Sequence, residues 1–154
     1  SGWDYTGMGQ FGASMSPLDA RVIALGRCRN SRATPVLMEK ADSLPADAAF
    51  SHFRALAEAF TTLGDAAGTP GLEALLERPG IAGHAILTQA DRDATATDDS
   101  CETSFRNRSL IELHLATALV RLDKDNVMGR QILTTYTRDL RGLFARHSRE
   151  VLDG

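Results

Sequence analysis

Apolar residues recur with helical spacing along most of this chain. In residues 46–64 (ADAAFSHFRALAEAFTTLG), large apolar side chains return every three or four positions, and Gly64 follows them as a C-terminal stop. A capping residue followed by proline, a pair that starts many helices, occurs at three places: Ser16–Pro17, Thr34–Pro35 and Thr69–Pro70. The pattern therefore predicts helices over residues 17–27, 35–42, 46–63 and 71–78.

The second half of the chain continues this pattern. Apolar residues at helical intervals predict further helices over residues 81–94, 100–122 and 129–147. No run alternates between apolar and polar residues as a strand does. We therefore expect an all-α fold of about six or seven helices in a single compact domain, residues 16–154. Residues 1–15 are rich in glycine and lack a period, so we expect a flexible arm or linker there.

Composition and charge narrow the possible functions. The length of 154 residues suits one domain, and 43% hydrophobic with 24% charged residues excludes a disordered tail. A net charge of -3 gives no general attraction to nucleic acid, so we expect protein partners instead. No apolar run approaches the ~20 residues of a membrane span, so no membrane association is expected. Two cysteines without zinc-site spacing predict no disulfide scaffold and no metal, and we expect no cofactor.

The stretch DDSCETS, residues 98–104, places a thiol among three carboxylates where the predicted helix 100–122 begins. Unpaired backbone N–H groups and the helix dipole favour a thiolate at Cys101, whereas Asp98, Asp99 and Glu102 disfavour a further negative charge. In one interpretation Cys101 is a nucleophile and a neighbouring carboxylate is a general base. In the other, an aspartate caps the helix, Glu102 completes a capping box and Cys101 packs inward.

Six residues of the same helix recur at helical spacing and form a mostly polar stripe: Thr103, Asn107, Leu110, His114, Thr117 and Arg121. Leu110 interrupts the polarity of this stripe. It is either an exposed leucine of the kind that protein surfaces commonly carry, or an apolar anchor for a protein partner with His114 beside it. Other sides of the helix, which include Leu115 and Leu119, are predicted to face the core.

One longer pattern is similar to a known family. The order ADAAFSHFRALAEAFTTL, then LEALLER, then ILTQADRDATATDDSCETS resembles the catalytic region of the novel E3 ligase family, the secreted bacterial E3 ubiquitin ligases. Downstream, residues 128–131 (MGRQ) and the helix ending Phe144-Ala145-Arg146 resemble the same family. The resemblance covers about residues 45–147, and its distinctive part is the cysteine segment.

The resemblance implies a specific chemistry. Cys101 would accept ubiquitin from a host E2 ubiquitin-conjugating enzyme and pass it to a lysine of a host substrate protein. The family has an acidic residue two positions after its cysteine, where this chain has Thr103. Asp98, Asp99 or Glu102 would then assist the attacking lysine. The resemblance also implies a type III secreted virulence effector that acts inside the host cell, in its cytoplasm.

Two other interpretations remain open. The Ala-, Arg- and Leu-rich helical character is similar to the XL-box domain of plant-pathogen effectors, a ligase type that positions the loaded E2 without a catalytic cysteine. In that case Leu110 and His114 would belong to the E2-binding surface. The third interpretation is a non-enzymatic helical interaction module, such as an adaptor or chaperone fragment. It predicts no ubiquitin transfer with any partner.

Overall fold

The computed structural model describes residues 16–95 and 104–154, and every regular element in these ranges is helical. The all-α prediction is therefore confirmed, while the expected arm over residues 1–15 lies outside the described part. The elements, in chain order, are α1 (Pro17–Arg27), α2 (Ala33–Ser43), α3 (Phe50–Leu63), the short 3₁₀ turn η1 (Ala66–Gly68), α4 (Thr69–Leu76), α5 (Gln89–Thr95), α6 (Ser104–Leu122), α7 (Val127–Tyr136) and α8 (Gly142–Asp153).

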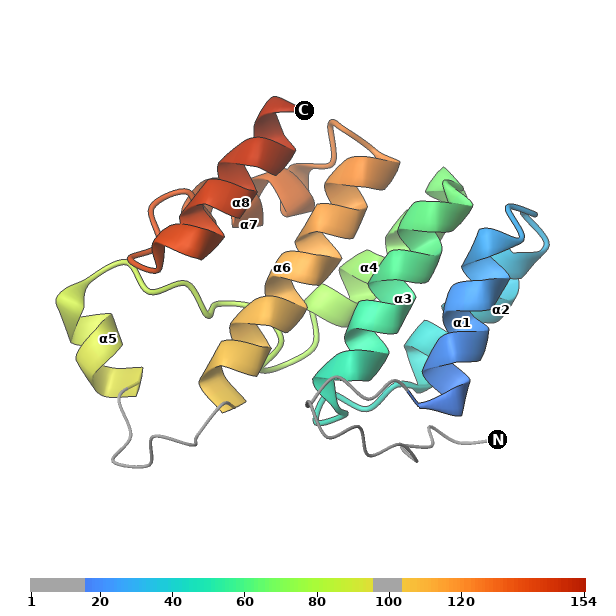
Figure 1. Ribbon diagram of the computed structural model, residues 1–154, viewed down its shortest axis with the longest axis horizontal. Helices are drawn as coiled ribbons and strands as arrows, with labels where there is room; N and C mark the ends of the chain where they lie inside the picture. The colour runs from blue at the N-terminus through green and yellow to red at the C-terminus, as the bar shows by residue number, and fades with distance from the viewer. Residues whose placement is uncertain (1–15, 96–103) are drawn as a thin grey trace.

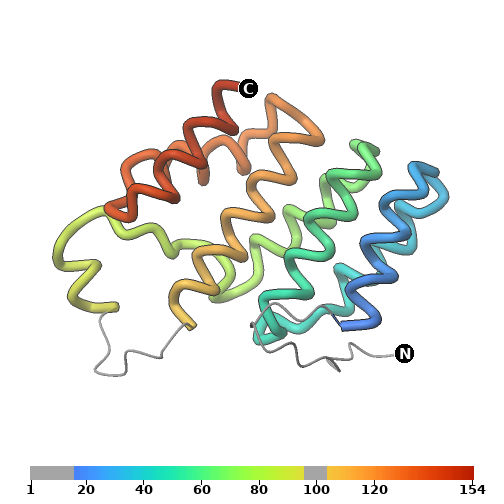
Figure 2. The backbone as a smooth tube through the Cα atoms, viewed as in Figure 1, coloured from blue at the N-terminus to red at the C-terminus, as the bar shows by residue number. Residues whose placement is uncertain are grey.

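The helices form two layers, and the chain alternates between them. Helices α1, α3, α6 and α8 lie side by side in a row, and α2, α4 and α7 pack behind that row (Figure 1). Each helix of the back layer returns the chain, so the helices of the front row all run in the same direction (Figure 2). The short helix α5 stands apart from the row and buries no residue.

The predicted start signal of α1 and the predicted stop signal of α3 are present. Thr34 and Thr69 were also predicted as caps, but they lie inside α2 and α4, which begin without a side-chain cap. Ser16 caps α1, because its Oγ accepts a hydrogen bond from the Asp19 N–H while Asp19 Oδ2 accepts one from the Ser16 N–H. Gly64 ends α3 in the left-handed region with φ of 71°. The helix α7 begins with a cap that the pattern did not reveal, since the Asn126 side chain accepts from the Gly129 N–H at 2.8 Å.

Two of the predicted helices are wrong in extent. Residues 81–88 are irregular and only α5 is helical in the range predicted as 81–94, because backbone N–H groups of this segment bond to distant carboxylates. The predicted helix 129–147 is divided into α7 and α8. At the break, the Asp139 carboxylate accepts from the Arg141 N–H, and the Leu140 N–H donates to the Ile86 carbonyl at 2.8 Å, so neither amide continues a helix.

Helix α6 lies at the centre because it contributes to both apolar clusters of the core. The larger cluster joins α6 to α1–α4 and includes Phe53, Phe60 and the predicted core residues Leu115 and Leu119, all fully buried. The second cluster joins α6 to α7 and α8, with Leu113, Ala116, Val120, Leu133, Tyr136 and Phe144. Burial on both sides of one helix fixes α6 against the two halves of the row.

Helices α1 and α3 make a close contact at each end. At one end, Asp19 and His52 are both buried and form a hydrogen bond of 2.6 Å between Oδ1 and Nδ1. At the other end, Gly26 lies against the backbone of Ala59, where a β-carbon would come within 2.4 Å of the carbonyl oxygen. The close approach of the two helices therefore requires glycine at position 26.

We expect Gly26→Ala to lower the free energy of unfolding by about 1–3 kcal/mol, because the added methyl group meets backbone that cannot rotate away. Gly142→Ala is the matched control, since a β-carbon there meets no atom within 4 Å. Urea denaturation of both variants measures the difference. An unchanged midpoint for Gly26→Ala would show that α1 and α3 do not approach as closely as described.

Candidate functional site

The predicted catalytic residues fall between two helices of different character. Cys101, Asp98, Asp99 and Glu102 lie outside the described residues, so their roles stay predictions. The chain before them is α5, which buries no residue, and the chain after them is the central helix α6. The cysteine segment thus joins a peripheral helix to the helix that holds the core together.

A buried carboxylate fixes the irregular segment that leads to α5. Glu112 of α6 is 4% exposed, and its two oxygens accept hydrogen bonds from the backbone N–H groups of Gly83 at 2.9 Å and His84 at 2.8 Å. The Tyr136 hydroxyl also donates to Glu112, at 2.8 Å. Burial and then the Glu112 carboxylate raise the pKa of Tyr136, so this phenol stays a hydrogen-bond donor.

A second buried carboxylate links the same irregular segment to the residues just before α8. Asp139 is buried and accepts hydrogen bonds from the Ile86 N–H at 2.9 Å and from the Arg141 side chain at 2.6 Å. Burial raises the pKa of Asp139, but the hydrogen bonds from Arg141 and Ile86 outweigh it and leave the pKa below its usual value. The Arg141 guanidinium also donates to the His84 carbonyl at 2.9 Å and lies 4.4 Å from the Phe144 ring centroid.

The polar stripe predicted on α6 is present, but much of it is covered. Leu110 is half-buried against the second apolar cluster, so the prediction of a freely exposed leucine is wrong. His114 is also half-buried, and its ring lies 5.5 Å from that of Phe50 in α3. The Thr117 hydroxyl is buried and lies 3.1 Å from Nε2 of His147 in α8. Leu110 and His114 therefore offer little surface as partner contacts, although that role itself stays a prediction.

Two positively charged arginines and a second histidine surround His114. Burial first, and then the positive charges of Arg54, His147 and Arg121, lower the pKa of His114 to about 4. The pKa of His147 is also lowered, by burial and by Arg121, with Glu150 acting in the opposite direction. His114 is therefore neutral at physiological pH and lies in a positive field.

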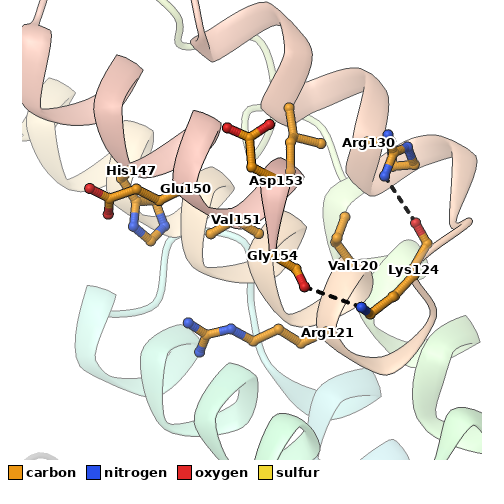
Figure 3. A pocket seen from close by; sticks show the side chains of 10 residues that line it. Val120, Arg121, Lys124, Arg130, His147, Glu150, Val151, Asp153 and Gly154 are labelled. Carbon is orange, nitrogen blue, oxygen red and sulfur yellow. Dashed lines mark hydrogen bonds between the residues drawn. The ribbon is translucent and has the colours of Figure 1, made fainter.

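Two grooves follow this face of α6 and share Arg121. One, of about 490 Å³, lies between α3 and α6. The other, of about 530 Å³, lies between α6, α7 and α8 (Figure 3). In the second groove Lys124 Nζ donates to the Gly154 carbonyl and Arg130 donates to the Lys124 carbonyl, both at 3.2 Å. Glu150 and Asp153 of α8 also line it, so positive and negative side chains share this groove.

Three exposed leucines lie in or near the irregular segment 81–88. Leu87, Leu140 and Leu143 are 38%, 49% and 62% exposed. The hydrogen bond from the Leu140 N–H to the Ile86 carbonyl brings the first two leucines into neighbouring segments, and Leu143 follows in the first turn of α8. These three side chains offer more apolar surface to a partner than Leu110 does.

The sequence reasoning did not find the buried polar network. Glu112 gave the clearest signal, because a charged residue in the apolar run LIELHLA needs buried partners. Its partners could not be identified from the sequence, since they are backbone amides far along the chain. Nothing in the sequence indicated that Arg54 and Arg121 line the same groove, because they belong to different helices.

Comparisons with known proteins give no family for this chain. It matches no protein-family model, no curated protein and no solved structure. Within the described ranges, no three His, Cys, Asp or Glu residues are grouped so as to hold a metal ion. No helix in the same ranges has the length and apolar character needed to cross a membrane.

We expect Tyr136→Phe to lower the free energy of unfolding by about 1–3 kcal/mol, because the buried Glu112 carboxylate loses one of its three donors. Glu112→Gln should cost more, since it leaves a buried amide N–H group facing backbone donors. Urea denaturation measures both effects. Equal stability of Tyr136→Phe and the parent would contradict the described hydrogen bond.

The lowered pKa of His114 predicts a loss of stability in acid. Between pH 6.5 and about 4 the unfolded chain binds a proton at this site and the folded chain does not, so stability falls as the pH falls. The expected contribution is about 1–3 kcal/mol over this range. His114→Gln should remove this pH-dependent contribution. The parent should therefore lose unfolding free energy relative to the variant as the pH falls toward 4. Parallel pH profiles for the two proteins would contradict the described environment.

Proposed function

We propose that this chain is the helical ubiquitin-transfer domain of a type III secreted bacterial effector. It promotes transfer of ubiquitin from a host E2 ubiquitin-conjugating enzyme to lysines of a host substrate protein. The observation that carries the proposal is the resemblance over about residues 45–147, centred on the thiol and carboxylates of DDSCETS. The all-α fold, with this segment joining α5 to α6, is compatible with that function.

In the covalent route, Cys101 and its neighbours perform two acyl transfers. The Cys101 thiolate attacks the thioester carbonyl of ubiquitin on the E2, and the E2 thiolate leaves. The substrate lysine then attacks the new thioester, one of Asp98, Asp99 or Glu102 takes the amine proton, and the Cys101 thiolate leaves. The buried Glu112 and Asp139 contacts support this route by fixing the chain that precedes α5.

In the positioning route, the domain holds the loaded E2 so that the lysine attacks it directly. Leu110 and His114 are the predicted contacts for this route, and the exposed side chains of Leu87, Leu140 and Leu143 add apolar surface for it. Exposed apolar patches commonly mark sites of protein–protein interaction. The positioning route needs no thiol.

A non-enzymatic interaction module is the second candidate function. The two open grooves along α6 and the exposed side chains of Leu87, Leu140 and Leu143 favour it, because exposed apolar surface often marks a protein–protein contact. This candidate differs from the first in predicting binding without any acceleration of ubiquitin transfer.

We expect the domain to accelerate discharge of ubiquitin from a loaded E2 onto free lysine, and Cys101→Ala to abolish the covalent route. Cys28→Ala is the matched control, since Cys28 is an exposed free cysteine elsewhere on the molecule. Incubation with activating enzyme, a panel of E2 enzymes and ubiquitin measures the rate. Cys101→Ser should accumulate an oxyester with ubiquitin that survives thiol treatment and is cleaved by hydroxide.

Each outcome of this assay selects one route. Discharge by the parent and Cys28→Ala, but not by Cys101→Ala, supports covalent catalysis. Equal discharge by all three supports positioning of the E2. Absence of discharge with every E2 overturns the proposed activity and leaves the interaction module.

A further inference from the structure

The groove between α3 and α6 holds positive side chains that lack ion-pair partners. It is lined on the α3 side by Arg54 and Thr61, and on the α6 side by His114, Thr117 and Arg121. Across the described part of the chain, neither Arg54 nor Arg121 lies within 4.0 Å of a carboxylate oxygen. The groove therefore has two guanidinium groups available to a ligand.

The one acidic residue among the described groove residues does not neutralise them. Glu58 of α3 lines the groove, but its Oε1 lies 3.3 Å from the guanidinium of Arg27 in α1. Arg54, His147 and Arg121 all act to lower the pKa of His114. A neutral His114 ring adds no charge of its own, so the groove attracts anions through its two arginines.

The two arginines lie at different levels along the groove. Helices α3 and α6 run in the same direction (Figure 2). The Phe50 ring lies 5.5 Å from that of His114, so Arg54, one turn after Phe50 on α3, and Arg121, two turns after His114 on α6, are offset by about one helical turn along the groove. The two arginines lie on opposite walls of the groove, and successive side chains of an extended peptide point to opposite sides. Two separate carboxylates, one for each wall, suit this arrangement better than one small anion.

We propose that the groove between α3 and α6 binds an extended acidic peptide segment of a partner protein, with one carboxylate that meets Arg54 and a neighbouring one that meets Arg121. Each guanidinium presents a planar pair of N–H donors that matches a carboxylate. Ala57 and Ala118 also line the groove and leave room for small side chains. This site does not depend on ubiquitin transfer, and binding is measurable whether or not the domain is an enzyme.

Fluorescence anisotropy with the full chain tests the proposal. The probe is a short labelled peptide of alanine and serine with two adjacent glutamates, and the comparison peptide carries glutamines in their place. We expect saturable binding of the first peptide, weakened as salt concentration rises. Arg54→Gln and Arg121→Gln should each weaken binding about fivefold, as loss of one exposed charge pair does.

Arg106→Gln is the matched control, because Arg106 is an exposed arginine of α6 that does not line the groove. It should bind the peptide as the parent does, and circular dichroism should show that all three variants keep the helical fold. Equal binding of the glutamine peptide, equal loss in Arg106→Gln, or full affinity in both groove variants would overturn the proposal. Absence of binding by the folded parent would overturn it as well.

Discussion

The buried carboxylate of Glu112 is the contact on which the arrangement of this fold depends. It joins the central helix α6 to the irregular residues 81–88 and to Tyr136 of α7. An unpaired charge in this place would cost several kcal/mol, but two backbone amides and a phenol satisfy it. The same contacts therefore explain why the chain leaves helical geometry after α4 and how α7 is held against α6.

The hydrogen bonds of Asp139 and Arg141 complete that arrangement on the α8 side. Arg141 bonds to the His84 carbonyl and to Ser109, so the segment before α5, the central helix and the corner between α7 and α8 share one set of contacts. A fully satisfied network of this kind specifies one arrangement of its elements. The peripheral helix α5 thus begins at a fixed place, although it buries no residue itself.

The periodic pattern predicted the helical class and, to within two residues, the starts of α1, α2, α4 and α7, because apolar periodicity is a local signal. It failed at residues 81–88, where backbone amides donate to the distant carboxylates of Glu112 and Asp139. It also failed at residues 137–141, where the Leu140 N–H donates to the Ile86 carbonyl and the Arg141 N–H to Asp139. The cysteine segment was predicted from residue types alone, and it lies outside the described residues. The groove between α3 and α6 could not, because Arg54 and Arg121 are brought together only when the row of helices forms.

Participation of α6 in both apolar clusters has a consequence for how the molecule opens. Loss of α6 would expose both clusters at once, so the two halves of the row unfold together as one cooperative unit. Helix α5 belongs to neither cluster and can open without exposing either. Amide protons of α6 therefore exchange with water only when the whole domain melts, whereas those of α5 exchange through local opening.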